Sequence, residues 1–597
     1  MRVWVVALCL GVLWLGAFPS FAGLPQRLVV LLDGVSYQHV RSLQEGVFRD
    51  ASGRVDGRQA FHHGYFPVRR LISTFPSASD IAWTEIFGSC PLPGYQRSYF
   101  SRRANRLVLQ NGVTTTVAYE RQMTWQEENG FRRAAGYMVP LRTYRAELRE
   151  MKERFLSDAS GRKEFYALLR VTDDAQHMGR DIKEMICLAD QTIESIREEY
   201  RHREGRELEV LVLSDHGNNQ VANGERIQVR RFLKRLGYRI NNSIRSRRDV
   251  VMPTVGVESW VEIHCHEAET EHLASLLPQL AGVDIVTARV PGESSEFLVV
   301  NRRGERARIS WDATANRLKY AALTGDPLEH LPVMGELERK QQLDANGFAS
   351  AEAWMASTLD HRYPLALERI ARGHTCVTLN PAPIIISLDN RYVHASWLLK
   401  KGSELVGLGG THGGLDDLNS TGILLSNYAP LEDTSANRVA ALCCGFAGLR
   451  DYRHVESGAE FVSATGQKLT RMARSPWDLS PAPPSNPGLH LRVWTPAFGK
   501  AGSGAALDVV VVHGRFRPGR IRRGDPPEKI LQQFELRPLE PADPQSPHER
   551  VYGFPENLDL KPGEVYRITG RLLEGRLKRP VFQFELYTDG QGRVVAF

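Results

Sequence analysis

The sequence predicts an α/β fold, a mainly parallel sheet with helices on both faces, and two observations indicate it. Three short runs rich in valine and leucine each end at a polar residue: Arg27–Leu32 before Asp33, Phe165–Val171 before Thr172, and Leu208–Leu213 before Ser214. Runs of this length and composition are typical of strands buried on both faces. Helical stretches lie between them, notably Asp181–Arg203, which is rich in glutamate, arginine and isoleucine. Apolar strands that alternate with helices form a parallel sheet covered on both sides.

Acidic and histidine residues follow these runs. Because the carboxyl ends of parallel strands open onto a common crevice, we expect the carboxylates there to be neighbours. The candidates, in chain order, are Asp33, Asp173, His177, Asp215, His216 and, in the glycine-rich segment GGTHGG, His412. A single aspartate at a strand end is more often a helix cap, so the prediction depends on the whole set. Carboxylate and imidazole groups without thiolate suit a catalytic zinc or manganese site.

The chain of 597 residues is too long for one compact domain. We predict a catalytic domain over residues 23–474, in which strand-like pieces such as Phe297–Val300 indicate an inserted subdomain or lid at roughly 225–400. Proline and serine dominate Ser475–Gly488, and this composition predicts a semi-rigid linker. Short β-rich segments beyond it predict a small β-sandwich-like domain at 489–597.

The first residues, MRVWVVALCLGVLWLGAFPSFA, have the pattern of a secretory signal peptide at 1–22, cut after Ala22. The apolar run Val3–Phe18 is short for a membrane span, and no later stretch is long and apolar enough to be one. We therefore expect a periplasmic or extracellular protein. The net charge of +7 suits anionic substrates, while no dense block of lysine and arginine indicates nucleic-acid binding.

Five short motifs stand in a set order along the chain. They are LLDG around Asp33, STFPSASDIAWTEIFG from Ser73 to Gly88, D-x-x-x-H-x-G from Asp173, SDHG around Asp215, and THGG around His412. This order resembles the alkaline phosphatase superfamily, and within it the nucleotide pyrophosphatase/phosphodiesterase-like branch. The resemblance covers roughly Arg27–Tyr452, so the C-terminal β-rich region lies outside it.

This resemblance implies a hydrolase of phosphate esters with two divalent metal ions, zinc or alternatively manganese. Asp173, His177 and His412 would hold the first ion. Asp33, Asp215 and His216 would hold the second, with a serine or threonine nucleophile beside it that forms a phospho-enzyme intermediate. The alternatives are a phosphotransferase that passes a head group to another acceptor at the same site, and a non-catalytic binding protein on the same scaffold.

Three hydroxyl groups are candidates for the nucleophile, which the resemblance places at the start of a helix about ten residues before a glycine-containing turn. Ser79 lies nine residues before Gly88. Thr74 matches the TFP signature of the phosphodiesterase branch but lies fourteen residues before the glycine, and Ser77 is a third candidate. The spacing from Gly88 favours Ser79. A nucleophile at the start of a helix would also gain backbone N–H donors for the phosphate.

Three other features bear on the chemistry of the site. Sulfatases of this superfamily carry Cys-x-Pro-x-Arg, but Cys90 is followed by PLPG, so sulfate ester hydrolysis is disfavoured. Arg97 and Ser98 are candidates for contact with the phosphoryl oxygens. The run VEIHCHEAETEH looks metal-binding, yet no carboxylate ladder accompanies its histidines, and we predict no metal at His264, His266 or His272.

Overall fold

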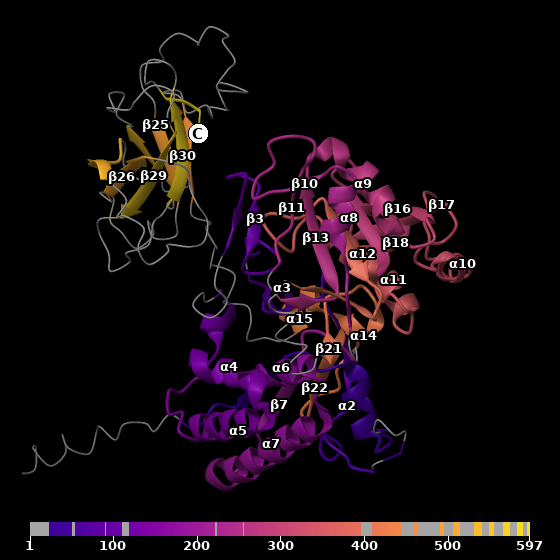
Figure 1. Cartoon of the computed structure of the whole chain (residues 1–597). Coiled ribbons are helices and arrows are strands. Elements are labelled where there is room, and N and C mark those ends of the chain that lie inside the picture. The colour runs from indigo at the N-terminus through magenta and orange to yellow at the C-terminus, as the bar shows by residue number, and fades with distance from the viewer. Residues whose placement is uncertain are drawn as a thin grey trace, which may run out of the picture. The chain divides into compact units, whose positions relative to one another are not determined.

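The computed structural model describes residues 23–442 apart from 50–53, 56, 90, 110–116, 118, 221–223, 255 and 396–408, and short stretches between 458 and 596. The chain divides into two compact units, Met1–Arg453 and His454–Phe597 (Figure 1). The predicted signal peptide and the predicted linker Ser475–Gly488 lie outside the described residues. Among the described residues, no helix has the length and apolar character needed to cross a bilayer.

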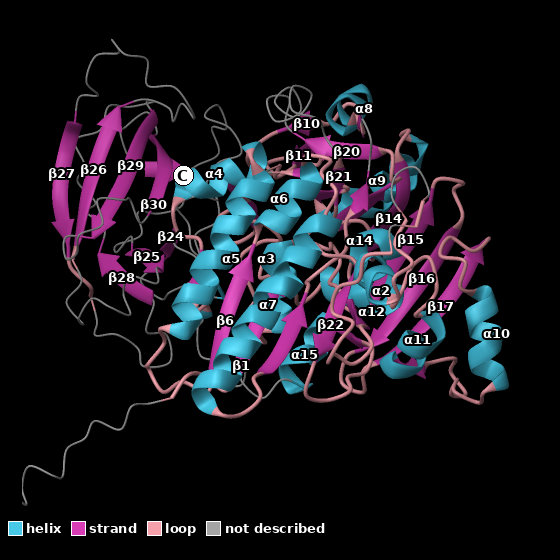
Figure 2. Ribbon diagram, turned by 90° about the horizontal axis from the view of Figure 1, so that it is seen from below, coloured by secondary structure: helices cyan, strands magenta, loops and turns pink. Residues whose placement is uncertain are grey.

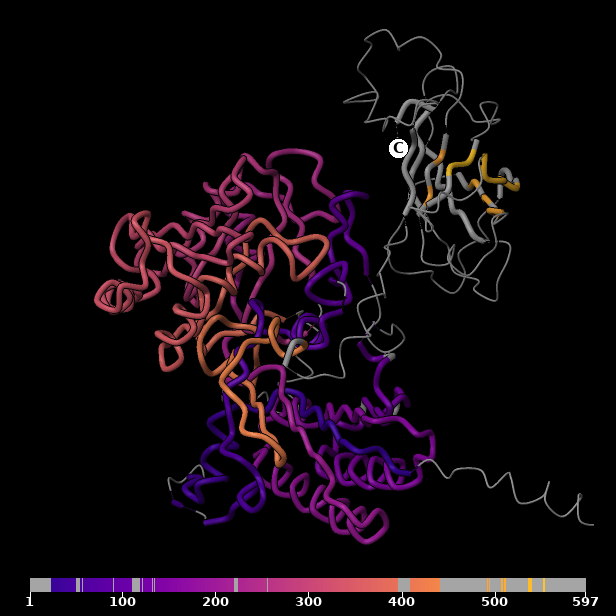
Figure 3. The backbone as a smooth tube through the Cα atoms, turned by 180° about the vertical axis from the view of Figure 1, so that it is seen from behind, coloured from indigo at the N-terminus to yellow at the C-terminus, as the bar shows by residue number. Residues whose placement is uncertain are grey.

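A seven-stranded sheet holds the three predicted apolar strands of the first unit. In spatial order its strands are β23 (Thr434–Ser435), β2 (Arg69–Ile72), β22 (Thr421–Ser426), β7 (Glu209–Leu213), β1 (Arg27–Leu32), β6 (Glu164–Leu169) and β5 (Trp125–Gln126). Strand β1 lies parallel to both β6 and β7, so the predicted mainly parallel arrangement is confirmed. The exception is β22, which runs antiparallel between β7 and β2. It comes from late in the unit, where the trace is orange in Figure 3.

Helices cover both faces of this sheet. One face packs against α5 (Pro140–Leu156) and α7 (Lys183–Glu204), which run side by side in Figure 2. The other face packs against α3 (Ser79–Ile86), which contacts α15 (Ala436–Leu442). Strand β1 alternates between the two cores: Leu28, Val30 and Leu32 belong to the first, and Val29 and Leu31 to the second. This alternation explains the unbroken apolar run in the sequence.

A nine-stranded sheet is formed by the region that was predicted as an inserted subdomain. In spatial order it contains β10 (Arg239–Ile240), β11 (Asp249–Val251), β13 (Trp260–Cys265), β19 (Ile384–Leu388), β14 (Val283–Arg289), β15 (Glu296–Asn301), β16 (Arg306–Asp312), β17 (Arg317–Thr324) and β18 (Ala349–Ser350). All of its pairs are antiparallel except β10 with β11. Its helices are α8 (Val229–Arg235), α9 (Thr270–Leu276), α10 (Leu331–Arg339), α11 (Ala351–Thr358) and α12 (Ala366–Gly373). Its role as a lid stays a prediction.

The remaining elements of the first unit are short. Helices α2 (Tyr37–Gln44), α4 (Gly130–Met138), α6 (Val171–His177) and α14 (Asp417–Ser420) connect the strands of the parallel sheet. Small sheets pair β12 (Val257–Glu258), β20 (Tyr392–Ala395) and β9 (Glu225–Arg226), then β21 (Gly410–Thr411) and β8 (Asn219–Gln220), and finally β3 (Tyr99–Ser101) and β4 (Arg106–Val108).

The described part of the second unit consists of strands, which confirms a small β-rich C-terminal region. One sheet contains β24 (Gly458–Val462), β25 (His490–Trp494) and β28 (Glu549–Gly553). The other contains β27 (Ile530–Leu536), β26 (Leu507–His513), β29 (Val565–Leu572), β30 (Phe582–Thr588) and β31 (Val594–Ala596). Neighbouring strands are antiparallel, and inward residues such as Leu491 and Val509 are buried.

Candidate functional site

Three buried carboxylates lie at the carboxyl ends of adjacent parallel strands. Asp33 directly follows β1, Asp215 follows β7 after one residue, and Asp173 lies in the first turn of α6, just after β6. The predicted strand at Phe165–Val171 ends earlier, at Leu169, because α6 begins at Val171. Gly34 has φ +71°, and a Cβ there would lie 2.6 Å from Asp173 Oδ1. A glycine at this position therefore lets the loop after β1 approach Asp173.

The first ligand group predicted from the sequence is brought together by α6 and the loop after β21. Asp173, His177 and His412 each offer one donor atom, and these atoms lie within 4.8 Å of one another. Asp173 Oδ2 is 3.0 Å from His177 Nε2 and 3.6 Å from His412 Nε2. His177 follows Asp173 by one helical turn, so both side chains lie on the same face of α6.

The second predicted group is formed by the ends of β1 and β7. Asp33, Asp215 and His216 also have donor atoms within 4.8 Å of one another. His216 Nε2 lies 3.6 Å from Asp33 Oδ1 and 3.3 Å from Asp215 Oδ2. The two groups adjoin, because the rings of His216 and His412 stack with their centroids 3.9 Å apart.

All three imidazoles are oriented in the same way. The Nδ1 atoms of His177, His216 and His412 lie 2.7–2.9 Å from the backbone carbonyl oxygens of Gly410, Gly217 and Ser77. A carbonyl oxygen only accepts, so each Nδ1 must carry the proton and donate. Nε2, the other ring nitrogen, faces the carboxylates, and it is the atom that would bind a metal ion, as at other histidine-ligated metals.

The electrostatics of the cluster favour a cation. Burial, and then the charges of Asp215 and Asp173, raise the pKa of Asp33 well above its usual range. Burial raises the pKa of Asp215 to about 7, and its Oδ2 atom is buried without a hydrogen-bond partner. Burial alone would lower the pKa of His412, but the charge of Asp173 raises it to about 10. These oxygen and nitrogen donors fit divalent zinc or manganese, whose charge would offset the three carboxylates.

Two further side chains, neither of them predicted from the sequence, support the cluster. Asn218 Nδ2 donates to Asp173 Oδ1 at 3.0 Å, which leaves Oδ2 toward the histidines. Gln176 Nε2 donates to the carbonyl oxygen of Gly34 at 2.7 Å and so ties α6 to the loop after β1. The available signal was position: Asn218 lies two residues after His216, and Gln176 lies between Asp173 and His177.

Of the three candidate nucleophiles, only the Ser79 hydroxyl lies against the cluster. Ser79 Oγ is 3.1 Å from Asp33 Oδ1 and 3.0 Å from His216 Nε2. It is the first residue of α3, whose N-cap, Ala78, makes no side-chain hydrogen bond to the first turn. Thr74 Oγ1 donates instead to the carbonyl oxygen of Pro76, and Ser77 Oγ to those of Thr74 and Gly414.

The remaining sequence candidates lie in other environments. Arg97 forms ion pairs with Asp80, the residue after Ser79, and with Glu120 at 2.7 Å. Ser98 is buried, and Cys90 lies outside the described residues. His264 Nε2 is 2.9 Å from Glu262, while His266 Nδ1 accepts from the N–H of Ala268. In the described part of the chain, neither histidine belongs to a group of three metal-ligand types.

Comparisons with known proteins add little. No protein-family model matches the chain, and no curated protein matches it. Among solved structures, murine ectonucleotide pyrophosphatase/phosphodiesterase 5, free and as an inactive variant in complex with AMP, is similar with a TM-score of 0.38 and 12% identity, over 72% of this chain and 96% of that one. The human protein of the same name gives a TM-score of 0.37 with the same identity and coverage. A likeness of this size does not establish a family.

Proposed function

We propose that this chain is a two-metal hydrolase of phosphate esters in which Ser79 is the nucleophile. The observation that carries the proposal is the position of Ser79 Oγ, 3.1 Å from Asp33 and 3.0 Å from His216. A hydroxyl in contact with one ligand group, directly beside a second, is the arrangement that a covalent phosphoryl transfer requires. The motif order places the chain, on this proposal, in the alkaline phosphatase superfamily.

Each of the two ligand groups would bind one metal ion. Asp173, His177 and His412 would hold one divalent ion, and Asp33, Asp215 and His216 the other, with zinc as the first choice and manganese as the alternative. Bound ions would supply Lewis acidity, which lowers the pKa of a nearby hydroxyl or water and offsets charge on the phosphoryl oxygens. The Nδ1 hydrogen bonds hold the three rings so that Nε2 of each faces the carboxylates, where it could bind a metal ion in place of its proton.

The chain's own groups carry out two displacements at phosphorus. Ser79 Oγ loses its proton to solvent and forms a bond to phosphorus, while the bond between phosphorus and the alcohol oxygen breaks and that oxygen takes up a proton. A water molecule then loses a proton to solvent as its oxygen forms a bond to phosphorus, the bond between phosphorus and Ser79 Oγ breaks, and Ser79 Oγ takes up a proton. The first turn of α3, which lacks a side-chain cap, offers N–H donors to the phosphoryl oxygens. Export from the cytoplasm, from the pattern of residues 1–22, belongs to the same proposal.

Replacement of the three hydroxyl residues, one at a time, tests the proposal. We expect Ser79→Ala to abolish hydrolysis of an aryl phosphate and an aryl phosphodiester, because loss of a nucleophile costs roughly 10⁶-fold in comparable enzymes. Metal content should stay near two ions per chain. Thr74→Ala and Ser77→Ala should keep measurable activity, because both hydroxyls donate to backbone carbonyls. Activity in Ser79→Ala together with a dead Thr74→Ala would contradict the assignment.

A further inference from the structure

Arg369, in α12, is a buried arginine whose hydrogen-bond partners are uncharged. It is 3% exposed. Nη1 donates to the carbonyl oxygens of Pro364 at 3.1 Å and Leu415 at 2.8 Å, and Nη2 donates to Ser77 Oγ at 3.1 Å. Nε and Nη2 both donate to the carbonyl oxygen of Thr74, at 3.3 and 3.1 Å. No carboxylate of the described residues forms an ion pair with it, although a buried charge is costly without compensation.

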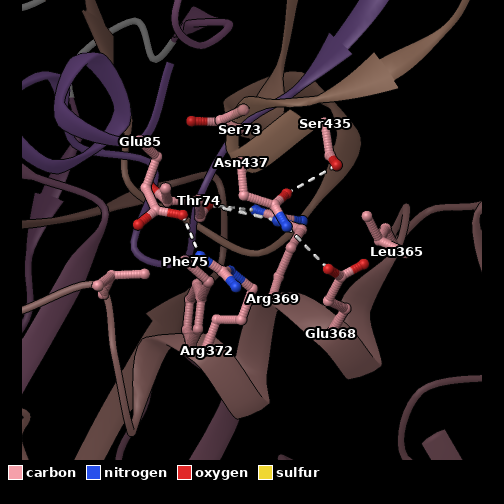
Figure 4. A pocket seen from close by; sticks show the side chains of 12 residues that line it. Ser73, Thr74, Phe75, Glu85, Leu365, Glu368, Arg369, Arg372, Ser435 and Asn437 are labelled. Atoms are coloured by element: carbon pink, nitrogen blue, oxygen red, sulfur yellow. Dashed lines mark hydrogen bonds and ion pairs between the residues drawn. The ribbon is translucent and has the colours of Figure 1, made fainter. Parts of the chain in front are cut away.

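The acceptors of Arg369 belong to two segments of the candidate site. Thr74 and Ser77 lie in the turn that precedes α3 and Ser79, and Leu415 follows the loop of His412. Figure 4 shows the guanidinium reaching from α12 toward Thr74, beside a small pocket that Phe75 and Asn437 also line. The guanidinium therefore bridges the segment that carries the nucleophile and the segment that carries a metal ligand.

These two segments also contact each other directly at Ser77. The carbonyl oxygen of Ser77 accepts from His412 Nδ1 at 2.9 Å, and the N–H of Ser77 donates to the carbonyl oxygen of Gly413 at 3.3 Å. The Ser77 hydroxyl donates to the carbonyl oxygen of Gly414 at 3.1 Å. The carbonyl group of Ser77 thus orients the imidazole of His412, while the hydroxyl group of Ser77 accepts a hydrogen bond from Arg369.

Helix α12 approaches the same turn at a second point. Gly373 packs against the backbone of Phe75, and a Cβ at this position would collide with the Phe75 carbonyl oxygen. The helix also packs on β15, β16 and β17 of the nine-stranded sheet. Helix α12, which packs on the nine-stranded sheet, therefore contacts the turn before Ser79 at both Arg369 and Gly373.

We propose that Arg369 is a positioning residue that fixes the turn Thr74–Ser77 against the loop after His412, and thereby sets the Ser79 hydroxyl relative to the His412 imidazole. This inference rests on the function proposed for Ser79 and His412. The planar guanidinium suits the task, because its five donors point in fixed directions toward several carbonyl oxygens at once. Burial lowers the pKa of Arg369 to about 9. This value is still above neutral pH, so the guanidinium stays cationic and keeps all of its donors.

The main test compares Arg369→Lys with Arg372→Gln. Lysine keeps the positive charge but lacks the forked set of guanidinium donors. We therefore expect kcat for an aryl phosphate to fall about 100-fold with KM changed little, which is the effect of a displacement of about 1 Å of a catalytic group. Zinc should also be released faster to a chelator, because His412 loses its support. Arg372 lies one turn further along α12 and pairs with Glu85, so Arg372→Gln should disturb the helix but leave kcat within about threefold and zinc release unchanged.

A double-mutant cycle separates positioning from simple support of the fold. Ser77→Ala removes the hydroxyl that Arg369 contacts, so its effects on kcat and zinc release should be non-additive with those of Arg369→Lys. The same Ser77→Ala change should be additive with Arg372→Gln. If Arg369→Lys lowers only the melting temperature, with kcat and zinc release as in the unmodified protein, the proposal is wrong. The zinc-release readout does not need activity, so failure of the Ser79 assignment would be seen separately in Ser79→Ala.

Discussion

The parallel and the antiparallel sheet of the first unit both bury histidines and carboxylates, but among the described residues these gather into groups of three only at the parallel sheet. At the ends of β1, β6 and β7, side chains from three separate strands meet, and two groups of three metal-ligand types form. In the nine-stranded sheet the buried polar groups form pairs: Glu262 with His264, two residues apart on β13, and Thr287 on β14 with His374, which follows α12, at 2.8 Å. Within the described residues, that sheet contains no group of three.

The difference follows from strand geometry. Parallel strands end at one edge, and the connections there start from adjacent positions, so polar residues distant in sequence converge. The carboxyl ends of neighbouring antiparallel strands lie at opposite edges, so a residue within such a strand meets its cross-strand neighbours and the residues two positions away on the same face. An acid or histidine in the nine-stranded sheet pairs instead with nearby side chains, as Asp284 does with Arg362 and Tyr363. The location of a carboxylate in the fold is thus a better guide to chemistry than its burial.

The largest difference expected between the two sheets comes from exchanging one carboxylate in each of them for its amide. Asp215→Asn should lower hydrolysis of an aryl phosphate more than about 100-fold, beyond the usual loss for an outer-sphere residue, and reduce bound zinc toward one per chain. Glu262→Gln is the matched control, because Glu262 is similarly buried at 3% exposure. We expect its activity to stay within about threefold, less than 1 kcal/mol in the activation free energy. Equal losses in both variants would remove the distinction between the two sheets.

A smaller effect is expected for the side chain that holds Asp173. Asn218→Ala removes the hydrogen bond to Asp173 Oδ1, and loss of such a partner typically costs about 10- to 100-fold in metal affinity or activity. Asn219 is the adjacent control: it is also buried, but its amide donates to the carbonyl oxygen of Asn390. Titration with zinc and steady-state kinetics should show weaker binding only in Asn218→Ala. Equal zinc affinities in the two variants would mean that α6 alone holds Asp173.

The contrast between the sheets also shows what the sequence could and could not predict. Asp33 directly follows a largely apolar run and Asp215 follows another after one residue, so their convergence could be predicted from strand ends alone. The end of the run at Phe165–Val171 was placed two residues too late, because Val171 is apolar both as a strand residue and in the first turn of α6. The antiparallel strand β22 was not predicted, since no local pattern shows which neighbour a strand will choose.

Arg369 could not be predicted, because its position depends on long-range packing. The sequence ALERIARG around it indicates only a helix. Its partner Thr74 is 295 residues away, and apart from the Ser77 hydroxyl all of its acceptors are backbone carbonyl oxygens, which the identity of a side chain does not reveal. Ser79 could be selected by its spacing from Gly88, but only the structure places its hydroxyl between Asp33 and His216.

The smallest predicted effect concerns the pH dependence of stability at Glu262. Burial raises the pKa of Glu262, although the hydrogen bond from His264 acts in the opposite direction. A glutamate whose pKa is raised in the folded state adds stability below its unfolded pKa of about 4.3, and this contribution is lost as pH rises through the folded pKa. Glu262→Gln carries no charge at any pH. Relative to the unmodified protein, the melting temperature of the variant should therefore rise as pH is increased from about 4.

The size of that change should be small. About 1 kcal/mol is typical for a single substitution and corresponds to about 2–4 °C in a domain of 150–250 residues. Melting curves of both proteins across the pH range, recorded with zinc present so that the metal cluster stays neutralised, would measure it. A variant whose relative melting temperature falls as pH rises would show that His264 holds Glu262 as a stabilising ion pair. The antiparallel sheet would then contain a charged pair of the same kind as Asp173 with His177, and only the lack of a third ligand would separate the two regions.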